Sequence, residues 1–424
     1  MSEQASLFTT PVPGQVSAAS PSASTQLPER EVPLIEEKAL QGLAGEIVAT
    51  FMPATEADPA AILMQLLVAV GNVLGRTAHA RVNEDRHYLN MYALLIGPSS
   101  KGRKGVAWNM VREFVRQLDP AWAARSIQSG LVSGEGVIHL VRDEDDDDPG
   151  VTDKRLMIVE GELAGPLQVI ERPGNTLSPT LRDAWDRDAL KTMGKNSPDR
   201  ATGAHVSLIG HCTDEEIRRY FGRLQALNGL GNRCLWTWCE RSKMLAEGGT
   251  PDPQTVSHLV TRFKVAMANA LSYGEMSRDS KARDLWAAIY PEITASKPGL
   301  VGALSARAEA QVLRLSCLYA ILDDSRVVME QHLTAAHALW KYTEQTLVNI
   351  FGEDSTDLLE VKVLKLLRAR QEGVTKTELY RELGNHVNGG RLSATLNVLE
   401  RRNLARKQTI QTDGRPSERW FPIS

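Results

Sequence analysis

The sequence predicts a mixed α/β protein with a smaller, mostly helical unit at its C-terminus. Three observations predict this fold. At 91–117 an apolar run, a glycine- and lysine-rich loop and an amphipathic segment indicate a strand, a turn and a helix. Through 252–350, apolar residues recur at helical spacing. The last segment, 357–424, shows three helical patterns followed by two short strands around an Asp-Gly turn.

The composition indicates a soluble cytoplasmic protein with no membrane segment. The chain has 424 residues, enough for two or three domains. It is 42% hydrophobic and 24% charged, as ordinary globular proteins are. No apolar run could span a bilayer, and the N-terminus lacks the features of a signal peptide. The four cysteines have neither metal-like nor disulfide-like spacing, which suits a reducing compartment.

The pattern along the chain predicts five segments. The first is rich in Ser, Pro, Thr and Gln and should be disordered. In the second, Asp58 can cap a helix whose first residue is Pro59. The predicted segments are a disordered tail (1–33), a helical region with lead-in strands (34–90), an α/β core (91–250), a helical lid (251–352) and the C-terminal unit (357–424).

The loop after the predicted strand Tyr92–Ile96 is the best indication of function. A turn of this kind between a strand and a helix presents backbone N–H groups to anionic oxygens, and a lysine reaches the outer phosphates. The predicted ATP-binding residues are Gly97, Ser100, Lys101, Gly102, Arg103, Lys104 and Gly105.

The sequence of this loop departs from the usual phosphate-binding motif, G-x-x-x-x-G-K-[ST]. Gly97 and Gly102 have the right spacing, but Arg103 and Lys104 occupy the Lys and Ser/Thr positions. Either Lys104 is the phosphate lysine in a loop one residue longer, or the site is weakened. No hydroxyl follows the lysine to hold Mg²⁺. The alternative is a solvated basic turn without a ligand.

Two acidic residues follow the next predicted strand. The apolar run Leu156–Val159 ends in Glu160 and Glu162. In nucleotide hydrolases a second strand ends beside the first and carries the acids that hold Mg²⁺ and polarise water. We therefore expect Glu160 to bind the metal and Glu162 to act on water. The alternative is an exposed strand end with ordinary carboxylates.

Two further residues are candidates for catalysis. A third strand, 204–213, ends near His211, which could sense the terminal phosphate or orient water. Arg233 follows a glycine-rich turn and could reach the nucleotide of a neighbouring subunit. Structural roles are the alternatives for both. In the helical region, Arg307 and Arg314 could also face the nucleotide.

The sequence pattern of the C-terminal unit predicts a winged helix-turn-helix. From Val361 to Ser424 there are 13 Lys/Arg and 6 Asp/Glu, a net charge of +7 in a chain whose total is −3. A basic unit on an acidic body favours binding to DNA, although many winged helices bind proteins instead. The third helix would present Arg391, Ser393 and Asn397 to the major groove, and the wing would bring Lys407 and Arg415 to phosphates.

The order of several motifs resembles a known group of proteins. SGEGVIHLVRD, RLMIVEGELAGPL, LRDAWDRDAL, AHVSLIGHCT, NGLGNRCLWTWCERSK and SARAEAQVLRLSCLYAILDD occur in succession over residues 35–350. They are similar to an uncharacterised P-loop ATPase, helicase-like family of phages, plasmids and integrated elements, often fused to or encoded beside primase-polymerase domains. The resemblance implies that Lys104 is the phosphate lysine. Val106 and Ala107 stand where members of the family often have Thr or Ser, and this chain carries no primase module.

Together, the motifs and the resemblance predict an α/β P-loop NTPase of RecA/AAA-like fold. We expect an ATP hydrolase that uses ATP and Mg²⁺, binds single-stranded and duplex DNA, and forms a homo-oligomer, with a hexameric ring and a primase or other replication partner implied by the resemblance. The predicted function is a replicative DNA helicase of a mobile element. The alternative is a replication initiator or helicase loader whose ATPase core serves mainly for oligomerisation.

Overall fold

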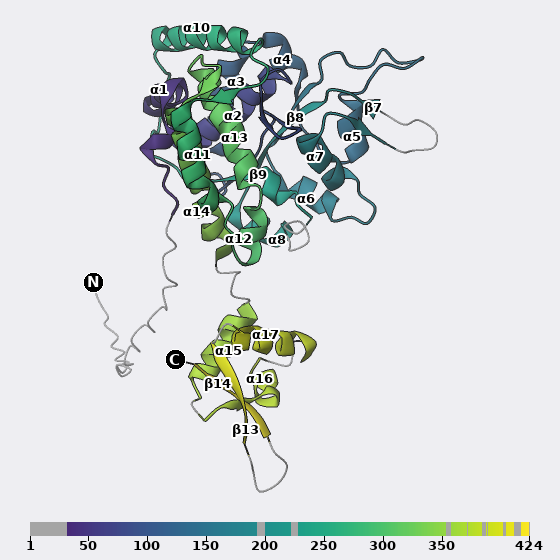
Figure 1. Ribbon diagram of the computed structural model, residues 1–424, viewed down its shortest axis with the longest axis vertical. Coiled ribbons are helices and arrows are strands. Elements are labelled where there is room, and N and C mark those ends of the chain that lie inside the picture. Colours follow the sequence, from purple (N-terminus) through teal and green to yellow (C-terminus); the bar gives the residue numbers. More distant parts are fainter. Residues whose placement is uncertain are drawn as a thin grey trace, which may run out of the picture. The chain divides into compact units, whose positions relative to one another are not determined.

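A central sheet of five parallel strands organises the larger part of the chain (Figure 1). Its spatial order is β4-β5-β8-β3-β9, and every pairing is parallel. The strands are β3 (Tyr92–Ile96), β4 (Ile127–Gln128), β5 (Arg155–Glu160), β8 (His205–Cys212) and β9 (Cys234–Trp238). The protein is therefore a mixed α/β protein, as the sequence predicts.

The computed structural model describes most of the chain. The described residues are 32–192, 200–221, 228–352, 358–370, 372–383, 387, 389–401, 404–410 and 417–423. The predicted disordered tail, apart from its last two residues, lies outside them.

Strand β3 lies in the interior of the sheet because it is apolar throughout. All five of its residues are buried, as expected for a parallel strand covered on both faces. Ala93 and Leu95 join one hydrophobic cluster, whereas Tyr92, Leu94 and Ile96 join a second cluster. The sheet therefore separates two helical layers.

Helix α2 (Pro59–Leu74) covers one face of the sheet and contacts β3, β5, β8 and β9. The predicted cap is confirmed: the Asp58 carboxylate accepts a hydrogen bond from the Ala60 N–H at 2.8 Å, and Pro59 is the first helical residue. Every residue of α2 after Pro59 is buried. This burial explains its apolar sequence, which is interrupted by only a few polar positions.

The helices after residue 251 pack onto the rest of the larger part of the chain and contribute residues to its two main hydrophobic clusters. They are α10 (Pro253–Ala270), α11 (Ser280–Ile293), α12 (Gly299–Leu304), α13 (Ala308–Leu322) and α14 (Glu330–Phe351), with the short strands β10 (Ser277–Arg278) and β11 (Val327–Val328). In α13 every residue except Glu309 is buried, because α1, α2, α10 and α14 pack around it. One hydrophobic cluster runs from Ala39 to Tyr342 and crosses three predicted segments.

Smaller elements complete the two layers. On the side of α2 and α13 are η1 (Glu37–Ala39), α1 (Gly42–Phe51), η2 (Met52–Ala54), α3 (Lys104–Arg116) and α4 (Pro120–Arg125). The lead-in hairpin of β1 (His79–Val82) and β2 (Asp85–Tyr88) lies between α2 and β3 in the chain. Across the sheet are α5 (Gly134–His139), α6 (Ala164–Ile170), α7 (Leu177–Asp186) and α8 (Asp214–Tyr220), of which α5 and α7 lie to the right in Figure 1. The remaining elements are η3 (Gly231–Arg233) and the strand pair β6 (Leu190–Lys191) and β7 (Arg200–Ala201).

The C-terminal residues form three helices and a three-stranded antiparallel sheet. The helices are α15 (Leu358–Arg368), α16 (Lys376–Glu382) and α17 (Gly389–Arg401), and the strands β12 (Val374–Thr375), β13 (Ala405–Ile410) and β14 (Ser417–Pro422) pair in the order β12-β14-β13. A hydrophobic cluster from Leu359 to Trp420 holds these elements together. Thr375 caps α16: its side chain accepts from the Glu378 N–H, and the Glu378 side chain accepts from the Thr375 N–H.

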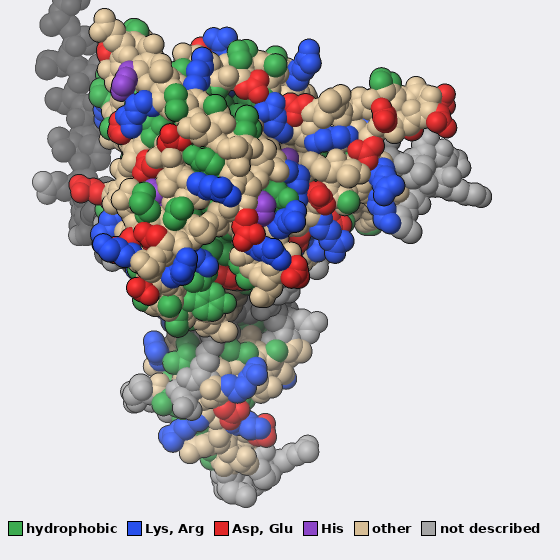
Figure 2. Space-filling view, turned by 45° about the horizontal axis from the view of Figure 1, so that its top comes forward, with side chains coloured by type: hydrophobic (Ala, Val, Ile, Leu, Met, Phe, Trp, Pro, Cys, Tyr) green, Lys and Arg blue, Asp and Glu red, His purple; other side chains and the backbone are tan. Residues whose placement is uncertain are grey.

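The surface is mixed in charge. Figure 2 shows basic and acidic side chains interspersed over the visible face of the larger part, and several Lys and Arg side chains on the C-terminal unit. Among the described residues, no helix is both long enough and apolar enough to cross a membrane.

Candidate functional site

The loop between β3 and α3 is built on close backbone contacts. A Cβ on Gly97 would lie 2.0 Å from the Cys239 carbonyl oxygen, and one on Gly102 would lie 3.1 Å from the same atom. The segment that follows β9 therefore leaves no room for a side chain at Gly97 and only a tight fit for one at Gly102. Ser100 and Arg103 adopt left-handed backbone conformations, with φ of 58° and 48°. The tight turn predicted between strand and helix is present.

The structure distinguishes the two candidate basic residues at the end of this loop. Lys104 begins α3, and its ammonium group turns back to donate to the Gly97 carbonyl oxygen at 2.9 Å. Arg103 points elsewhere: its Nε donates to a Glu56 carboxylate oxygen at 2.7 Å. Lys101 is exposed on the turn. Lys104 is thus the basic side chain that the loop encloses, and burial lowers its pKa.

The first turn of α3 offers free backbone donors. Its N-cap residue, Arg103, makes no side-chain cap hydrogen bond, as is also true of the described N-caps of α1, α6, α7, α12 and α13. An uncapped helix start has unsatisfied N–H groups and a partial positive charge, both of which favour an anion. A Cβ on Gly105 would have no heavy atom within 4 Å, so this side of the helix start is open.

The acidic strand is not the direct neighbour of β3. β8 pairs with both β3 and β5, so the prediction that the acids end beside the loop strand is wrong by one strand. Glu160 ends β5 and is buried; its Oε1 accepts hydrogen bonds from the backbone N–H groups of Gly130 and Leu131, both at 2.7 Å. Glu162 is exposed two residues further on. Glu160 thus has a structural role whether or not it binds a metal.

His211 is joined to the start of α3 through one glutamine. The Gln65 amide nitrogen donates to the Ala61 carbonyl at 3.0 Å and to the Lys104 carbonyl at 3.4 Å. These two acceptors fix the orientation of the amide, so its oxygen faces His211 Nε2 at 3.0 Å. His211 Nε2 must therefore carry the proton, which leaves Nδ1 as a hydrogen-bond acceptor.

His211 is neutral at physiological pH. Burial, and then the nearby charge of Lys104, lower its pKa to about 4. A neutral imidazole of fixed tautomer beside a lysine can orient a polar ligand or water, and it cannot add a second positive charge to the site.

Arg233 lies at the opposite end of the sheet from the loop. It immediately precedes Cys234, which pairs with Tyr92 at the start of β3, whereas the loop follows Ile96 at the other end. A strand of this length spans roughly 16 Å at about 3.3 Å per residue. Arg233 is 7% exposed and bonds to Asp186 at 2.5 Å. Arg233 therefore does not contact the loop of its own chain.

Arg314 also lies at this amino end of the sheet. Its guanidinium donates to the Asn90 carbonyl at 2.6 Å and to the Trp185 carbonyl at 3.0 Å. It therefore does not face the loop, contrary to the suggestion from the sequence. Burial lowers its pKa to about 9.

The C-terminal candidates are only partly described. Ser393 and Asn397 lie on α17, where Asn397 is exposed and Ser393 donates to the Gly389 carbonyl at 3.0 Å. Lys407 is exposed on β13, 3.4 Å from Glu418. Arg391 lies on α17, but its side chain is outside the described part, as is the whole of Arg415.

A fit test for Mg²⁺ and ATP gives a mixed result. Lys104, the uncapped α3 and the open side of Gly105 suit a phosphate group. Within the described ranges, no three His, Cys, Asp or Glu residues cluster as metal ligands. Mg²⁺ commonly takes only one or two protein carboxylates and completes its shell with phosphate and water, so Glu160 fits it as a partial ligand set.

Sequence reasoning missed three residues that shape these sites: Glu56, Gln65 and Asp186. Only Gln65 left a signal, because it is a polar residue inside an otherwise apolar helical run. The partners of Glu56 and Asp186 are 47 residues distant in the chain, at Arg103 and Arg233.

Two comparisons with known proteins found no match to this chain. No model of a protein family matches the chain, and a search of curated proteins finds no similar sequence.

Proposed function

We propose that this protein is a DNA-dependent ATPase with a P-loop core of RecA/AAA-like type, acting as a ring-forming replicative helicase of a phage, plasmid or integrated element. The observation that carries the proposal is the enclosed Lys104 at the start of an uncapped helix that follows β3. Glycine-rich loops that lead into helix N-termini bind phosphate groups. The motif series in the sequence supports the same assignment and the mobile-element source.

The strand order supports this class of fold. In chain order the five strands would be numbered 1 to 5, and their spatial order is then 5-1-4-3-2. One strand, β8, stands between the loop strand and the acid strand, and because all three are parallel their carboxyl ends lie at the same edge of the sheet. His211, the last residue but one of β8, would sense the terminal phosphate from this edge.

Each residue has a distinct role in the proposed hydrolysis. Lys104 would neutralise charge on the transferring phosphoryl group, and the α3 N–H groups would bind its oxygens. Glu160 would contribute its second oxygen to Mg²⁺, which lowers the charge on the phosphates when bound. Glu162, exposed at the same edge, would polarise the attacking water, and neutral His211 would orient it.

Arg233 would act on the nucleotide of a neighbouring subunit. Its distance from the loop of its own chain favours this arrangement, because only a second copy could bring a nucleotide to the amino end of the sheet. Oligomer formation is part of the same proposal.

The C-terminal unit would bind duplex DNA as a winged helix. Three helices with an antiparallel β-sheet, a net charge of +7 from Val361 onward, and exposed Asn397 and Lys407 support this role. Affinity for duplex DNA should fall steeply with salt, because each neutralised phosphate releases counterions. Fluorescence anisotropy with full-length and truncated chains tests it. Unchanged affinity after removal of 357–424 would indicate a protein-binding unit.

The central experiment measures phosphate release with and without single-stranded DNA, together with particle size. DNA-stimulated hydrolysis and a ring that appears with ATP and single-stranded DNA are the expected results. A chain that neither binds nor hydrolyses ATP at any protein concentration would refute the proposal.

One observation favours a second candidate, a replication initiator or loader with little hydrolysis. Glu160 already accepts two backbone hydrogen bonds, and no hydroxyl follows Lys104 to hold Mg²⁺. In that case the chain should bind ATP and assemble, yet release phosphate no faster when DNA is added. Comparison of ATP binding with steady-state turnover separates the two candidates.

A further inference from the structure

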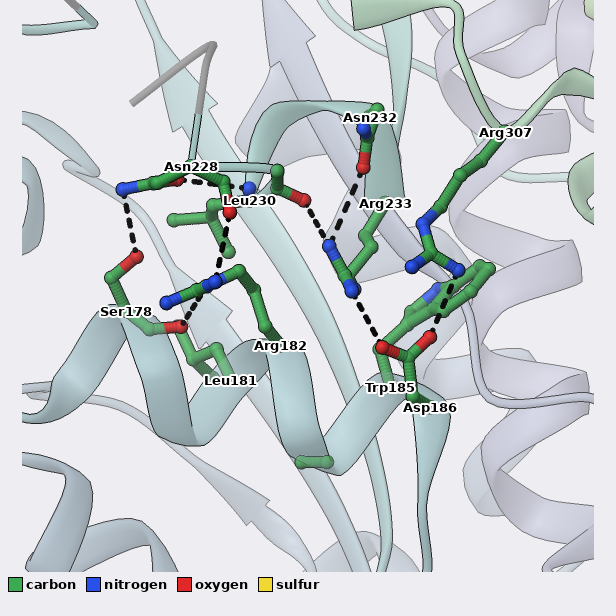
Figure 3. Close-up of polar contacts among 12 residues, drawn as sticks. Ser178, Leu181, Arg182, Trp185, Asp186, Asn228, Leu230, Asn232, Arg233 and Arg307 are labelled. Carbon is green, nitrogen blue, oxygen red and sulfur yellow. Dashed lines mark hydrogen bonds and ion pairs between the residues drawn. The ribbon is translucent and has the colours of Figure 1, made fainter. Parts of the chain in front are cut away.

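Three arginines gather around a single tryptophan at the amino end of the sheet. The guanidinium carbons of Arg314, Arg307 and Arg233 lie 3.6, 5.2 and 5.9 Å from the centre of the Trp185 ring. Trp185 and its neighbour Asp186 end α7, whereas the arginines come from η3, the start of α13 and α13 itself. Figure 3 shows the Asp186 carboxylate between the guanidinium groups of Arg233 and Arg307.

One carboxylate serves two of these arginines. Asp186 Oδ2 accepts from Arg233 at 2.5 Å, and Oδ1 accepts from Arg307 at 3.0 Å. The third, Arg314, bonds only to Asn90 and to the Trp185 carbonyl among the described residues. Positive charge therefore exceeds negative charge here. The pKa of Arg307 is lowered by burial first, and then by repulsion from Arg233.

Several donors in the cluster are buried without an acceptor. Among the described residues, Arg233 Nε, Arg314 Nε and Trp185 Nε1 have no hydrogen-bond partner, and all three side chains are more than nine-tenths buried. Buried polar groups are normally paired, and exceptions often mark a ligand site. Arg307 is the accessible member, since its side chain is 35% exposed.

We propose that this cluster is a phosphoryl-binding site kept occupied by Asp186 in the resting chain. Arg307 and Arg233 would take two oxygens of one phosphoryl group in place of the two Asp186 oxygens. Two guanidinium groups around one tetrahedral anion make charge-assisted hydrogen bonds that a single carboxylate only partly replaces. Asp186 is then a positioning residue: it holds the two guanidinium groups as a pair and is released when the phosphoryl group arrives.

The source of the phosphoryl group is a nucleotide carried by a second copy of the chain, and this part rests on the proposed ATPase function. A nucleotide on the chain's own loop would be separated from the cluster by the length of β3. The proposal goes beyond a role for Arg233 alone on the neighbouring subunit's nucleotide in two respects. Arg307 acts together with Arg233, and Asp186 competes with the ligand.

The first test uses tripolyphosphate as the probe, on the full chain carrying Lys104→Ala so that the loop does not dominate binding. At constant ionic strength, tripolyphosphate should raise the melting temperature of this variant by a few degrees relative to chloride. Adding Asp186→Asn should enlarge the shift, and adding Arg307→Ala should remove it. Asp188→Asn is the matched control, since Asp188 pairs with Arg76 at 3.9 Å and should leave the shift unchanged. An unchanged shift in the Arg307→Ala chain would overturn the proposal.

The second test identifies the source of the phosphoryl group. Mixing Lys104→Ala chains with Arg307→Ala chains should give ATP hydrolysis several-fold above the sum of the separate variants. An Arg307-dependent shift with an oligonucleotide and none with tripolyphosphate would assign the site to nucleic acid and overturn the proposal. If the wild-type chain hydrolyses no ATP, an Arg307-dependent tripolyphosphate shift would still support the phosphoryl site, although the ATPase proposal would fail.

Discussion

Replacing Lys104 with alanine should slow hydrolysis by roughly two to three orders of magnitude while leaving the fold intact. The ammonium group already lies at the loop, 2.9 Å from the Gly97 carbonyl oxygen, so little rearrangement is needed to reach a phosphate. A unit charge ~4 Å away contributes about 4 kcal/mol at an effective dielectric constant of about 20. Because part of this attraction is already present before the reaction, we expect kcat to fall roughly 100- to 1,000-fold, as when one preorganised donor is removed.

The effect on stability should be small and could be favourable. The substitution removes a hydrogen bond worth about 1 kcal/mol. It also relieves the burial that lowers the pKa of Lys104, which is a cost of keeping the ammonium form in the folded protein. The melting temperature should therefore change by a few degrees at most, in either direction.

The assay is steady-state phosphate release, measured with and without single-stranded DNA, next to thermal unfolding. Lys101→Ala is the matched comparison, because Lys101 lies on the same loop but is exposed, and its turnover should fall less than that of Lys104→Ala. If the Lys104→Ala protein keeps wild-type turnover, the reasoning is refuted. A large drop in melting temperature would instead indicate a structural role.

Three further predictions concern the acids at the end of β5, the start of α3 and the buried His205. Glu162→Gln should retain ATP binding by calorimetry and lose turnover, since an amide cannot polarise water as a carboxylate does. Glu160→Gln should in addition lower the free energy of unfolding by about 1–3 kcal/mol, because a neutral amide oxygen accepts the two backbone N–H hydrogen bonds more weakly than a carboxylate. Normal turnover in both variants would show that Glu160 and Glu162 have no role in hydrolysis. Gly105→Ser should fold, because a Cβ there meets no atom within 4 Å, and should raise Mg²⁺-dependent turnover if a hydroxyl is what the site lacks; unchanged turnover at all Mg²⁺ concentrations would contradict that. Burial lowers the pKa of His205 to about 3. The unfolded chain therefore binds a proton at this imidazole more readily than the folded chain does. The free energy of unfolding should fall as the pH falls from about 6.5 toward 3, by ~1.4 kcal/mol for each pKa unit of difference. Urea unfolding at several pH values should show a smaller decline for His205→Gln, and an equal decline would assign the acid sensitivity to other groups.

The sequence by itself determined the local elements. The apolar run Tyr92–Ile96 predicted a buried strand, and Asp58 predicted a helix cap, because these signals depend on neighbouring residues. The loop position was also predicted, since its glycines and lysines are contiguous.

Only the tertiary structure decided which residues meet. It placed β8 between β3 and β5, and it buried α13 on every side, because strand pairing and helix packing depend on contacts between distant parts of the chain. It also separated Lys104 from Arg103. The sequence predicted Lys104 as the phosphate lysine and grouped Arg103 with the ATP-binding residues, but it gave no sign that Arg103 pairs with Glu56, a carboxylate 47 positions away.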